Sequence, residues 1–276
     1  MILPRILRPL IMGIVNITPD SFSDGGAFLD RDRAVAHALE LVQQGADILD
    51  LGGESTRPGA EPVAAEVQIE RVLPVLEQLV QSLPEGFPLS IDTTLGPVAE
   101  AAIHAGASII NDISAGEEDA HMFSLAAAAG VDLILMHKQG TPATMQENPV
   151  YEDVVEEVRD YLLERAAAAL SAGVKQENIV IDPGIGFGKT LEHNLLIMEN
   201  LGRYVETDYP VLLGASRKSF LKRLCQRGEP GALAGATCAT TVLGVQAGVR
   251  ILRVHDVREN RQALDVAWAL KESRGT

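Results

Sequence analysis

The chain has 276 residues, with 38 acidic side chains against 23 Lys plus Arg, and so a formal net charge of −15 at pH 7. Nucleic acids and anionic membrane surfaces are bound through clustered basic side chains, so this composition argues against a partner of either kind. With 46% hydrophobic and 22% charged residues, the chain can bury a full hydrophobic core. Disorder is therefore excluded as its dominant state.

The two cysteines and the N-terminal segment bear on where the protein works. Cys225 and Cys238 lie thirteen positions apart without a C-x-x-C pairing, which fits neither a disulfide scaffold nor a cysteine-rich metal site, and we expect both to be small buried apolar side chains. Prolines and arginines interrupt residues 1–10 before the apolar core of a signal peptide can form. No stretch approaches the ~18 apolar residues of a membrane span. We predict a cytoplasmic protein.

Short β-rich runs recur along the chain in chain order. They cover residues 11–15, 47–51, 88–91, 108–110, 131–136, 179–181, 211–213 and 250–254. Most are continuously apolar, as expected for parallel strands that are covered on both faces. Segments with helical spacing separate them, at residues 29–44, 63–83, 97–105, 120–129, 151–172, 191–201, 219–226, 235–247 and 259–271. Several of these end at a glycine that can adopt the left-handed C-terminal cap, namely Gly45, Gly106, Gly130, Gly173 and Gly248.

Eight strand-then-helix units in a chain of this length predict an α/β protein with a (β/α)₈ barrel, which typically needs about 250 residues. A doubly wound open sheet stays as the alternative, because periodicity does not reveal whether the sheet closes. No linker, low-complexity tract or charge block marks a boundary, so we expect one domain over residues 1–276.

Polar residues follow nearly every predicted strand. Each has an ordinary structural interpretation: Asp92 and Asp112 as helix N-caps, Asn111 as a turn residue, Lys218 as a surface charge. These interpretations must all hold independently, whereas a single pocket explains the whole set. Since the carboxyl ends of barrel strands meet on one rim, we predict an active site there.

The glycine-rich segment 182–189 (DPGIGFGK) requires a separate test against nucleotide-binding signatures. A phosphate-binding loop of the type G-x-x-x-x-G-K-[ST] needs glycine where Pro183 stands. The dinucleotide fingerprint G-x-G-x-x-G, started at Gly184, needs glycine where Lys189 stands. Neither ATP nor NAD is supported.

Five segments together resemble the dihydropteroate synthase family, in its order and spacing from about residue 11 to 259. They are 12–26 (MGIVNITPDSFSDGG), 52–59 (GGESTRPG), 182–189 (DPGIGFGK), 216–219 (SRKS) and 253–256 (RVHD). The resemblance implies a (β/α)₈ barrel, in agreement with the strand and helix pattern. It also implies an enzyme of folate biosynthesis that joins 6-hydroxymethyl-7,8-dihydropterin diphosphate to 4-aminobenzoate and releases pyrophosphate. Sulfonamides are expected to compete with 4-aminobenzoate.

The resemblance also implies roles for particular residues. For the pterin they are Asp92, Asn111, Met136, Asp182, Phe187, Lys218 and Arg253. For the diphosphate they are Asn16, Thr56, Arg253 and His255, with Mg²⁺ coordinated at Asn16. For 4-aminobenzoate they are Phe22, Thr56, Arg57, Pro58 and Ser219. The residues expected to carry catalysis are Asp92, Arg57, Lys218, Arg253 and His255.

Two alternatives to the synthase are a folate-binding methyltransferase and a paralogue that binds pterin without catalysis. Folate-binding methyltransferase barrels share the pterin pocket but have no use for a diphosphate site or an aminobenzoate loop, so the segments 55–58 (STRP) and 217–219 (RKS) favour the synthase. A catalytically silent pterin-binding paralogue should have lost some of Arg57, Lys218, Arg253 or His255, and all are present. The family also implies a homodimer, for which the apolar residues of 235–247 and 259–271 could serve.

Overall fold

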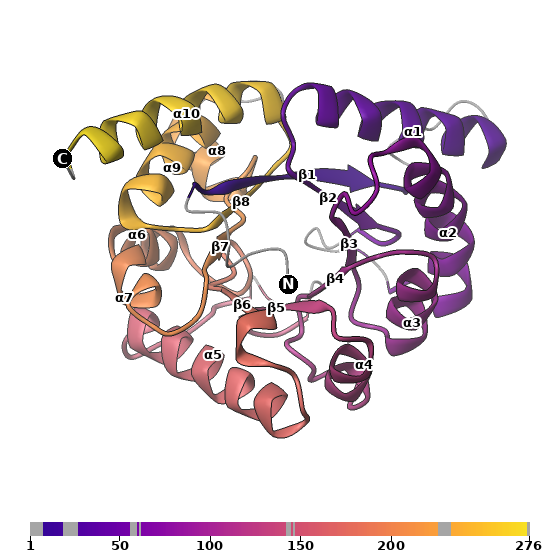
Figure 1. Cartoon of the computed structure of the whole chain (residues 1–276). Helices are drawn as coiled ribbons and strands as arrows, with labels where there is room; N and C mark the ends of the chain where they lie inside the picture. Colours follow the sequence, from indigo (N-terminus) through magenta and orange to yellow (C-terminus); the bar gives the residue numbers. More distant parts are fainter. Residues whose placement is uncertain are drawn as a thin grey trace.

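The computed structural model describes residues 8–18, 27–55, 60, 62–141, 145, 147–225 and 233–274. Within these residues, eight parallel strands form the inner wall of a barrel and helices surround it (Figure 1). The strands are β1 (Leu10–Asn16), β2 (Ile48–Gly52), β3 (Leu89–Asp92), β4 (Ile109–Asp112), β5 (Asp132–Met136), β6 (Ile179–Asp182), β7 (Leu212–Leu213) and β8 (Ile251–Val254). All eight coincide with the predicted strands to within two residues at either end.

The hydrogen-bonded order of the strands runs β6-β5-β4-β3-β2-β1-β8-β7. A single parallel bridge between Ile181 and Val211 then joins β6 to β7, supported by a bond from the Ile181 amide to the Pro210 carbonyl at 2.9 Å. The two ends of the sheet therefore meet, which confirms the (β/α)₈ barrel and rules out the open sheet.

The helices pack around the outside of the barrel in chain order. They are α1 (Ala27–Gln43), α2 (Ala65–Ser82), α3 (Gly96–His104), α4 (Met122–Ala129), α5 (Val154–Ser171), α6 (Leu191–Glu199), α7 (Leu201–Val205), α8 (Ser219–Cys225), α9 (Ala234–Ala247) and α10 (Val257–Arg274). The five glycines predicted to cap helices all have left-handed backbones, with φ between 67° and 112°. The C-terminal ends of these five helices thus follow from local sequence.

Three details differ from the sequence prediction. The segment 191–201 was predicted as one helix, but the backbone leaves the helical region at Asn200, and the short α7 follows. The predicted helix 151–172 begins only at Val154, because the Asp153 side chain caps it by accepting bonds from the amides of Val155 and Glu156. The prediction that both cysteines are buried is wrong, since Cys225 is exposed and Cys238 is half-buried.

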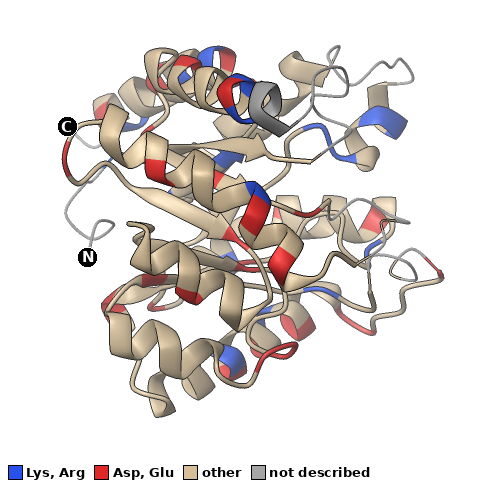
Figure 2. Cartoon of the chain, turned by 90° about the vertical axis from the view of Figure 1, so that its right-hand side faces the viewer, with Lys and Arg blue, Asp and Glu red and all other residues tan. Residues whose placement is uncertain are grey.

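The surface bears out the acidic composition. Asp and Glu are distributed over the outer helices, with Lys and Arg between them (Figure 2). Within the described residues, no helix is long and apolar enough to cross a lipid bilayer.

Candidate active site at the carboxyl ends of the strands

The inside of the barrel is built in two layers. The lower layer is apolar and consists of Leu10, Met12, Ile48, Ile109, Ile134, Val180, Leu212 and Ile251, which pack together across the barrel. Because alternate residues of a strand face the same side, the residue two positions further on also points inward. In four strands that residue is polar: Asp50, Asn111, Asp182 and Arg253. The apolar lower layer is called the apolar plug below. The layer nearest the rim, formed by these four residues together with Asp92, Phe187 and Lys218, is called the polar floor.

Arg253 lies at the centre of this floor and bridges two carboxylates from other strands. Its Nε donates to Asp50 Oδ2 and its Nη2 donates to Asp92 Oδ2, each at 2.6 Å. Although burial opposes it, the charges of these two carboxylates raise the pKa of Arg253, so the guanidinium stays protonated. Asn111 joins the same network, because its Nδ2 donates to Asp50 Oδ2 at 3.1 Å. Strands β2, β3, β4 and β8 are thus linked through their side chains.

Burial raises the pKa of Asp92 to about 7, against the opposing charge of Arg253. Its Oδ1 atom is buried and finds no hydrogen-bond partner among the described residues. A carboxylate left in this state can accept a hydrogen bond from a ligand or stabilise a positive charge placed above it.

Asp182, Phe187 and Lys218 form the other half of the floor. The Asp182 Oδ1 atom accepts the Gly184 amide at 2.7 Å, and burial raises the pKa of Asp182 to about 6. Lys218 Nζ lies 3.8 Å from the centre of the Phe187 ring, and burial lowers the pKa of Lys218 to about 8. Phe187 belongs to a small apolar cluster that includes Met136. A flat ligand would meet a carboxylate, an ammonium group and apolar side chains here.

Lys189 holds the glycine-rich loop 182–189 in place through hydrogen bonds of its ammonium group. Its ammonium group is buried, and its Nζ lies 2.9 Å from His137 Nδ1 and 3.0 Å from the carbonyl oxygens of Gly184 and Phe187. Burial lowers the pKa of Lys189 to about 7, yet these three acceptors match the three donors of an ammonium group. Burial also lowers the pKa of His137 to about 2, so the ring is neutral and its Nδ1 can accept. The loop that carries Phe187 is thereby fixed to β5.

We expect Lys189→Met to destabilise the fold by about 2–4 kcal/mol, because it leaves buried carbonyl oxygens without donors. Urea denaturation followed by circular dichroism measures this as a lower midpoint. The matched control is Lys222→Met, on the exposed face of α8, which should leave the midpoint unchanged. Equal midpoints for the two variants would contradict this role of Lys189.

The connections after β7 and β8 are tied together at the rim. Ser216 Oγ accepts the His255 amide at 3.1 Å and lies 3.0 Å from His255 Nδ1. Arg217 forms a bidentate ion pair with Asp256, at 3.0 and 2.5 Å. Burial and the neighbouring Arg217 and Arg253 lower the pKa of His255 to about 3. The imidazole is therefore neutral, and if the Ser216 hydroxyl donates to Nδ1, the Nε2–H remains available as a donor.

The remaining residues singled out from the sequence are Asn16, Ser219 and Asp112, which the structure describes, and four residues that it does not. Asn16 ends β1 and is partly exposed, and Ser219 begins α8 and is exposed. Asp112 does not cap a helix, since α4 begins only at Met122, and it instead accepts bonds from Ser114 and Gly116 in the turn after β4. The predicted residues Phe22, Thr56, Arg57 and Pro58 lie outside the described residues.

Sequence reasoning missed Asp50, Lys189 and Arg217. Asp50 is a fully buried acid inside an otherwise apolar strand, and that contrast was the signal. Lys189 ends the family segment 182–189, but its sequence context predicts no role for it. Arg217 has a left-handed backbone, with φ of 57°, which its sequence context does not reveal.

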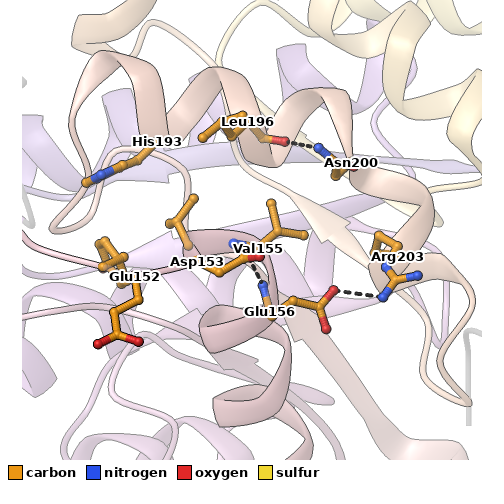
Figure 3. A pocket seen from close by; sticks show the side chains of 10 residues that line it. Glu152, Asp153, Val155, Glu156, His193, Leu196, Asn200 and Arg203 are labelled. Atoms are coloured by element: carbon orange, nitrogen blue, oxygen red, sulfur yellow. Dashed lines mark hydrogen bonds and ion pairs between the residues drawn. The ribbon is translucent and has the colours of Figure 1, made fainter.

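A separate cavity of about 410 Å³ lies outside the barrel, between the start of α5 and helices α6 and α7 (Figure 3). Its polar groups pair within it or with adjacent backbone: Arg203 bonds Glu156 at 2.8 Å, Asn200 bonds the Leu196 carbonyl, and Asp153 caps α5. It shares no residue with the polar floor of the barrel.

Comparison with known proteins agrees with this geometry. The family model described as "Pterin binding enzyme" matches residues 12–255. The chain is 45% identical to the dihydropteroate synthase of Bacillus subtilis over 252 residues, which cover 91% of this chain and 85% of that protein. Two solved structures are similar over 96% of this chain. One is the Xanthomonas albilineans dihydropteroate synthase with 4-aminobenzoic acid (TM-score 0.89, 44% identity, 93% of that chain covered). The other is the Yersinia pestis enzyme in complex with a sulfonamide drug (TM-score 0.90, 38% identity, 95% covered).

A closed barrel with a buried polar floor, matched by this family model over most of its length, defines the class of pterin-binding enzymes. Within that class, the chain belongs to the dihydropteroate synthase family.

Proposed function

We propose that the polar floor of this barrel is where the chain carries out the reaction of its family. That reaction joins 6-hydroxymethyl-7,8-dihydropterin diphosphate to 4-aminobenzoate in folate biosynthesis and gives 7,8-dihydropteroate and pyrophosphate. The observation that carries the assignment to this floor is the convergence of Asp92, Asp182, Lys218 and Arg253 from four parts of the barrel onto one partly exposed face at the carboxyl ends of the strands.

The pterin fits the chemistry of this face. A dihydropterin presents an amino group beside a ring N–H, a pair of donors that the Asp182 carboxylate can accept in two parallel bonds. Asn111 both donates and accepts, and Lys218 can donate to the ring carbonyl. Met136 and Phe187 supply apolar contacts with the ring faces, and the planar guanidinium of Arg253 suits stacking against a flat ligand.

The diphosphate is assigned to Asn16, Thr56, Arg253 and His255. Among the described residues, no group of three or more His, Cys, Asp or Glu side chains could hold a metal ion. One amide oxygen from Asn16 fits Mg²⁺ only if the substrate phosphates and water complete the coordination, which is the arrangement Mg²⁺ prefers. Bound in this way, Mg²⁺ would neutralise the negative charge of the diphosphate. The neutral His255 ring can donate one hydrogen bond to a phosphate oxygen.

The reaction is a substitution at the exocyclic CH₂ of the pterin. The bond from this carbon to the diphosphate oxygen breaks, and the amine of 4-aminobenzoate forms the new bond to carbon and releases one N–H proton to the departing pyrophosphate or to water. The electron-rich ring can share the positive charge that develops on the carbon, and Asp92 stabilises that charge from below. Arg253 and His255 stabilise the departing diphosphate. No protein nucleophile is required, so trapping of a covalent enzyme–pterin adduct would contradict this mechanism.

The amine substrate is assigned to Phe22, Thr56, Arg57, Pro58 and Ser219. Ser219 stands at the rim immediately after Lys218, so an aminobenzoate carboxylate near it would place the amine toward the pterin site. Sulfonamides are expected to compete at the same place.

The direct test incubates the purified protein with the pterin diphosphate, Mg²⁺ and 4-aminobenzoate, and measures dihydropteroate and pyrophosphate together. Both products should form in equal amounts, and EDTA should abolish them. A sulfonamide should raise the KM for 4-aminobenzoate without changing kcat. Absence of both products at high protein concentration would remove the assignment.

Binding of the pterin ring should weaken at acidic pH. The pKa of Asp182 is about 6 in the free protein, and only its ionised form accepts two donors. Affinity should therefore fall by about tenfold for each pH unit below 6. Calorimetry with 6-hydroxymethyl-7,8-dihydropterin, which lacks the diphosphate, measures this between pH 5 and 8. The Asp182→Asn variant should lose this dependence on pH, and a flat wild-type profile would count against the role of Asp182.

We also propose that the protein is a cytoplasmic homodimer. Leu243 on α9 and Val266 and Leu270 on α10 are large apolar side chains that are at least half exposed, and α9 and α10 pack against each other. The double variant Val266→Glu/Leu270→Glu should sediment as a monomer. Val150→Glu, at an equally exposed valine before α5, is the control and should leave the dimer intact. Unchanged sedimentation of the double variant would move the interface elsewhere.

A further inference from the structure

Asp50 is the one acid of the polar floor to which neither the family motifs nor the mechanism assigns a role. It lies on β2 and is fully buried. It is two residues before Gly52, which is the β2 residue in register with Asp92. Its Oδ2 atom accepts two bonds, from Arg253 Nε at 2.6 Å and from Asn111 Nδ2 at 3.1 Å. One oxygen atom of Asp50 therefore holds two of the residues that are assigned to the pterin.

The bond to Arg253 fixes the plane of the guanidinium. Asp50 holds the Nε atom and Asp92 holds the Nη2 atom, so the planar group is anchored at two separate points. A planar fork held at two points has little freedom to rotate. Without Asp50, the Arg253 side chain would be held only through its tip by Asp92.

The bond to Asn111 fixes which way its amide points. Since Nδ2 donates to Asp50, the Oδ1 atom and the second N–H are left for a ligand. A ligand edge with one donor and one acceptor matches this arrangement. If the amide turned over, its carbonyl oxygen would face the Asp50 carboxylate and the pattern presented to the ligand would change.

Asp50 also sets the charge balance around Asp92. The charges that act on Asp92 are those of Arg253 from β8, Asp50 from β2, Lys218 from the connection after β7 and, most weakly, Asp112 from β4. One guanidinium is thus shared between two buried carboxylates. The Oδ1 atoms of both carboxylates find no partner among the described residues, so neither carboxylate is fully neutralised by hydrogen bonds within the floor.

We propose that Asp50 is a positioning residue, which sets the plane of the Arg253 guanidinium and the amide orientation of Asn111 toward the pterin. It acts through these two residues and does not itself touch the substrate. This inference rests on the proposed roles of Arg253 and Asn111 in pterin binding.

The test is Asp50→Asn, which keeps the size of the side chain but removes its charge. We expect the KM for the pterin diphosphate to rise by about 10- to 100-fold, because a charged hydrogen bond to Arg253 is lost and the hold on Asn111 weakens. The KM for 4-aminobenzoate should stay within about twofold. Burial and, to a smaller extent, the charge of Asp50 raise the pKa of Asp92. Because the variant removes the charge of Asp50, the acid limb of the kcat/KM profile should move to lower pH.

Ser90→Ala is the matched control. Ser90 is the register partner of Asp50 on β3, is fully buried, and its Oγ finds no hydrogen-bond partner among the described residues. This variant should keep wild-type KM values and the wild-type pH profile. A purely structural role for Asp50 would lower the thermal midpoint of Asp50→Asn and leave KM and the pH profile unchanged, and that result would overturn the inference.

If Asp50→Asn does not fold, Asp50→Glu tests the same point, because it keeps the charge and displaces the carboxylate by one methylene. Its KM for the pterin diphosphate should rise while the acid limb stays in place. An unchanged KM in Asp50→Glu would also overturn the inference. A wild-type protein that forms no dihydropteroate would instead refute the activity, so the two failures are distinguishable.

Discussion

Asp182→Asn should lower kcat/KM for the pterin diphosphate by about 10²- to 10⁴-fold and Lys218→Ala by about 10- to 10²-fold, while the thermal midpoint of each stays within a few degrees of the wild type. Asp182→Asn disrupts two charged hydrogen bonds to the ring and Lys218→Ala removes one, and each such bond is worth about 1.5–3 kcal/mol. The fold should survive Asp182→Asn, because the asparagine carbonyl oxygen can still accept the Gly184 amide that Asp182 Oδ1 accepts at 2.7 Å. Lys218 contributes a contact with the Phe187 ring, and little of the core depends on it.

Steady-state kinetics and differential scanning calorimetry on the same preparations separate the two effects. Asp208→Asn and Lys222→Ala, at exposed positions outside the floor, are the charge-matched controls and should behave as the wild type in both measurements. Unfolding of both Asp182→Asn and Lys218→Ala would make these residues structural instead. Full activity in either variant would remove that residue from the pterin site.

Gly184→Ala should be among the most destabilising single methyl additions in the protein. A Cβ atom at this position would lie 1.9 Å from the His137 carbonyl oxygen, and the backbone has φ of +66°. Neither partner can move freely, because Lys189 bonds the carbonyl oxygen of Gly184 and Asp182 bonds its amide. We expect a loss of more than about 3 kcal/mol, which corresponds to a fall in Tm of about 6–12 °C or to failure of the chain to fold.

Gly130→Ala separates the steric effect from the backbone effect. Gly130 has almost the same φ, +67°, but nothing lies within 4 Å of a Cβ atom built there. This variant should lose only about 1 kcal/mol, the usual cost of a left-handed alanine. Thermal melts of the two variants side by side give the answer, and equal shifts would show that the His137 carbonyl can move aside.

The fold could be predicted because its determinants are local. Continuous apolar runs marked the strands, and glycines such as Gly45 and Gly248 marked the helix ends, where the structure places left-handed backbones. The separate α7 was missed because the helical spacing continues past Asn200 although the backbone does not. Capping by Asp153 likewise shortened α5 in a way that apolar spacing does not show.

Several site residues could be predicted because they stand at or near the end of a strand. Asp92, Asn111 and Asp182 end or nearly end their strands, and the structure places Asn111 and Asp182 among the buried residues and Asp92 partly exposed at the same rim. The hydrogen bond between Arg253 and Asp50 joins residues 203 positions apart, so the local sequence of β2 does not predict it. The role of Lys189 could not be predicted for a similar reason, because the pairing of β5 with β6 brings its partners His137 and Gly184 together.

The layered interior of the barrel bears on how this enzyme can change during evolution. The polar floor lies directly above the apolar plug, with one residue between inward-facing positions on each strand. Inserting or deleting a single residue within a strand would exchange its inward and outward faces, burying outward-facing side chains in the barrel and removing a floor residue at the same time. Changes in length should therefore be confined to the connections between strands and helices. A lineage that altered the amine substrate by lengthening those connections could do so without disturbing the pterin half of the site.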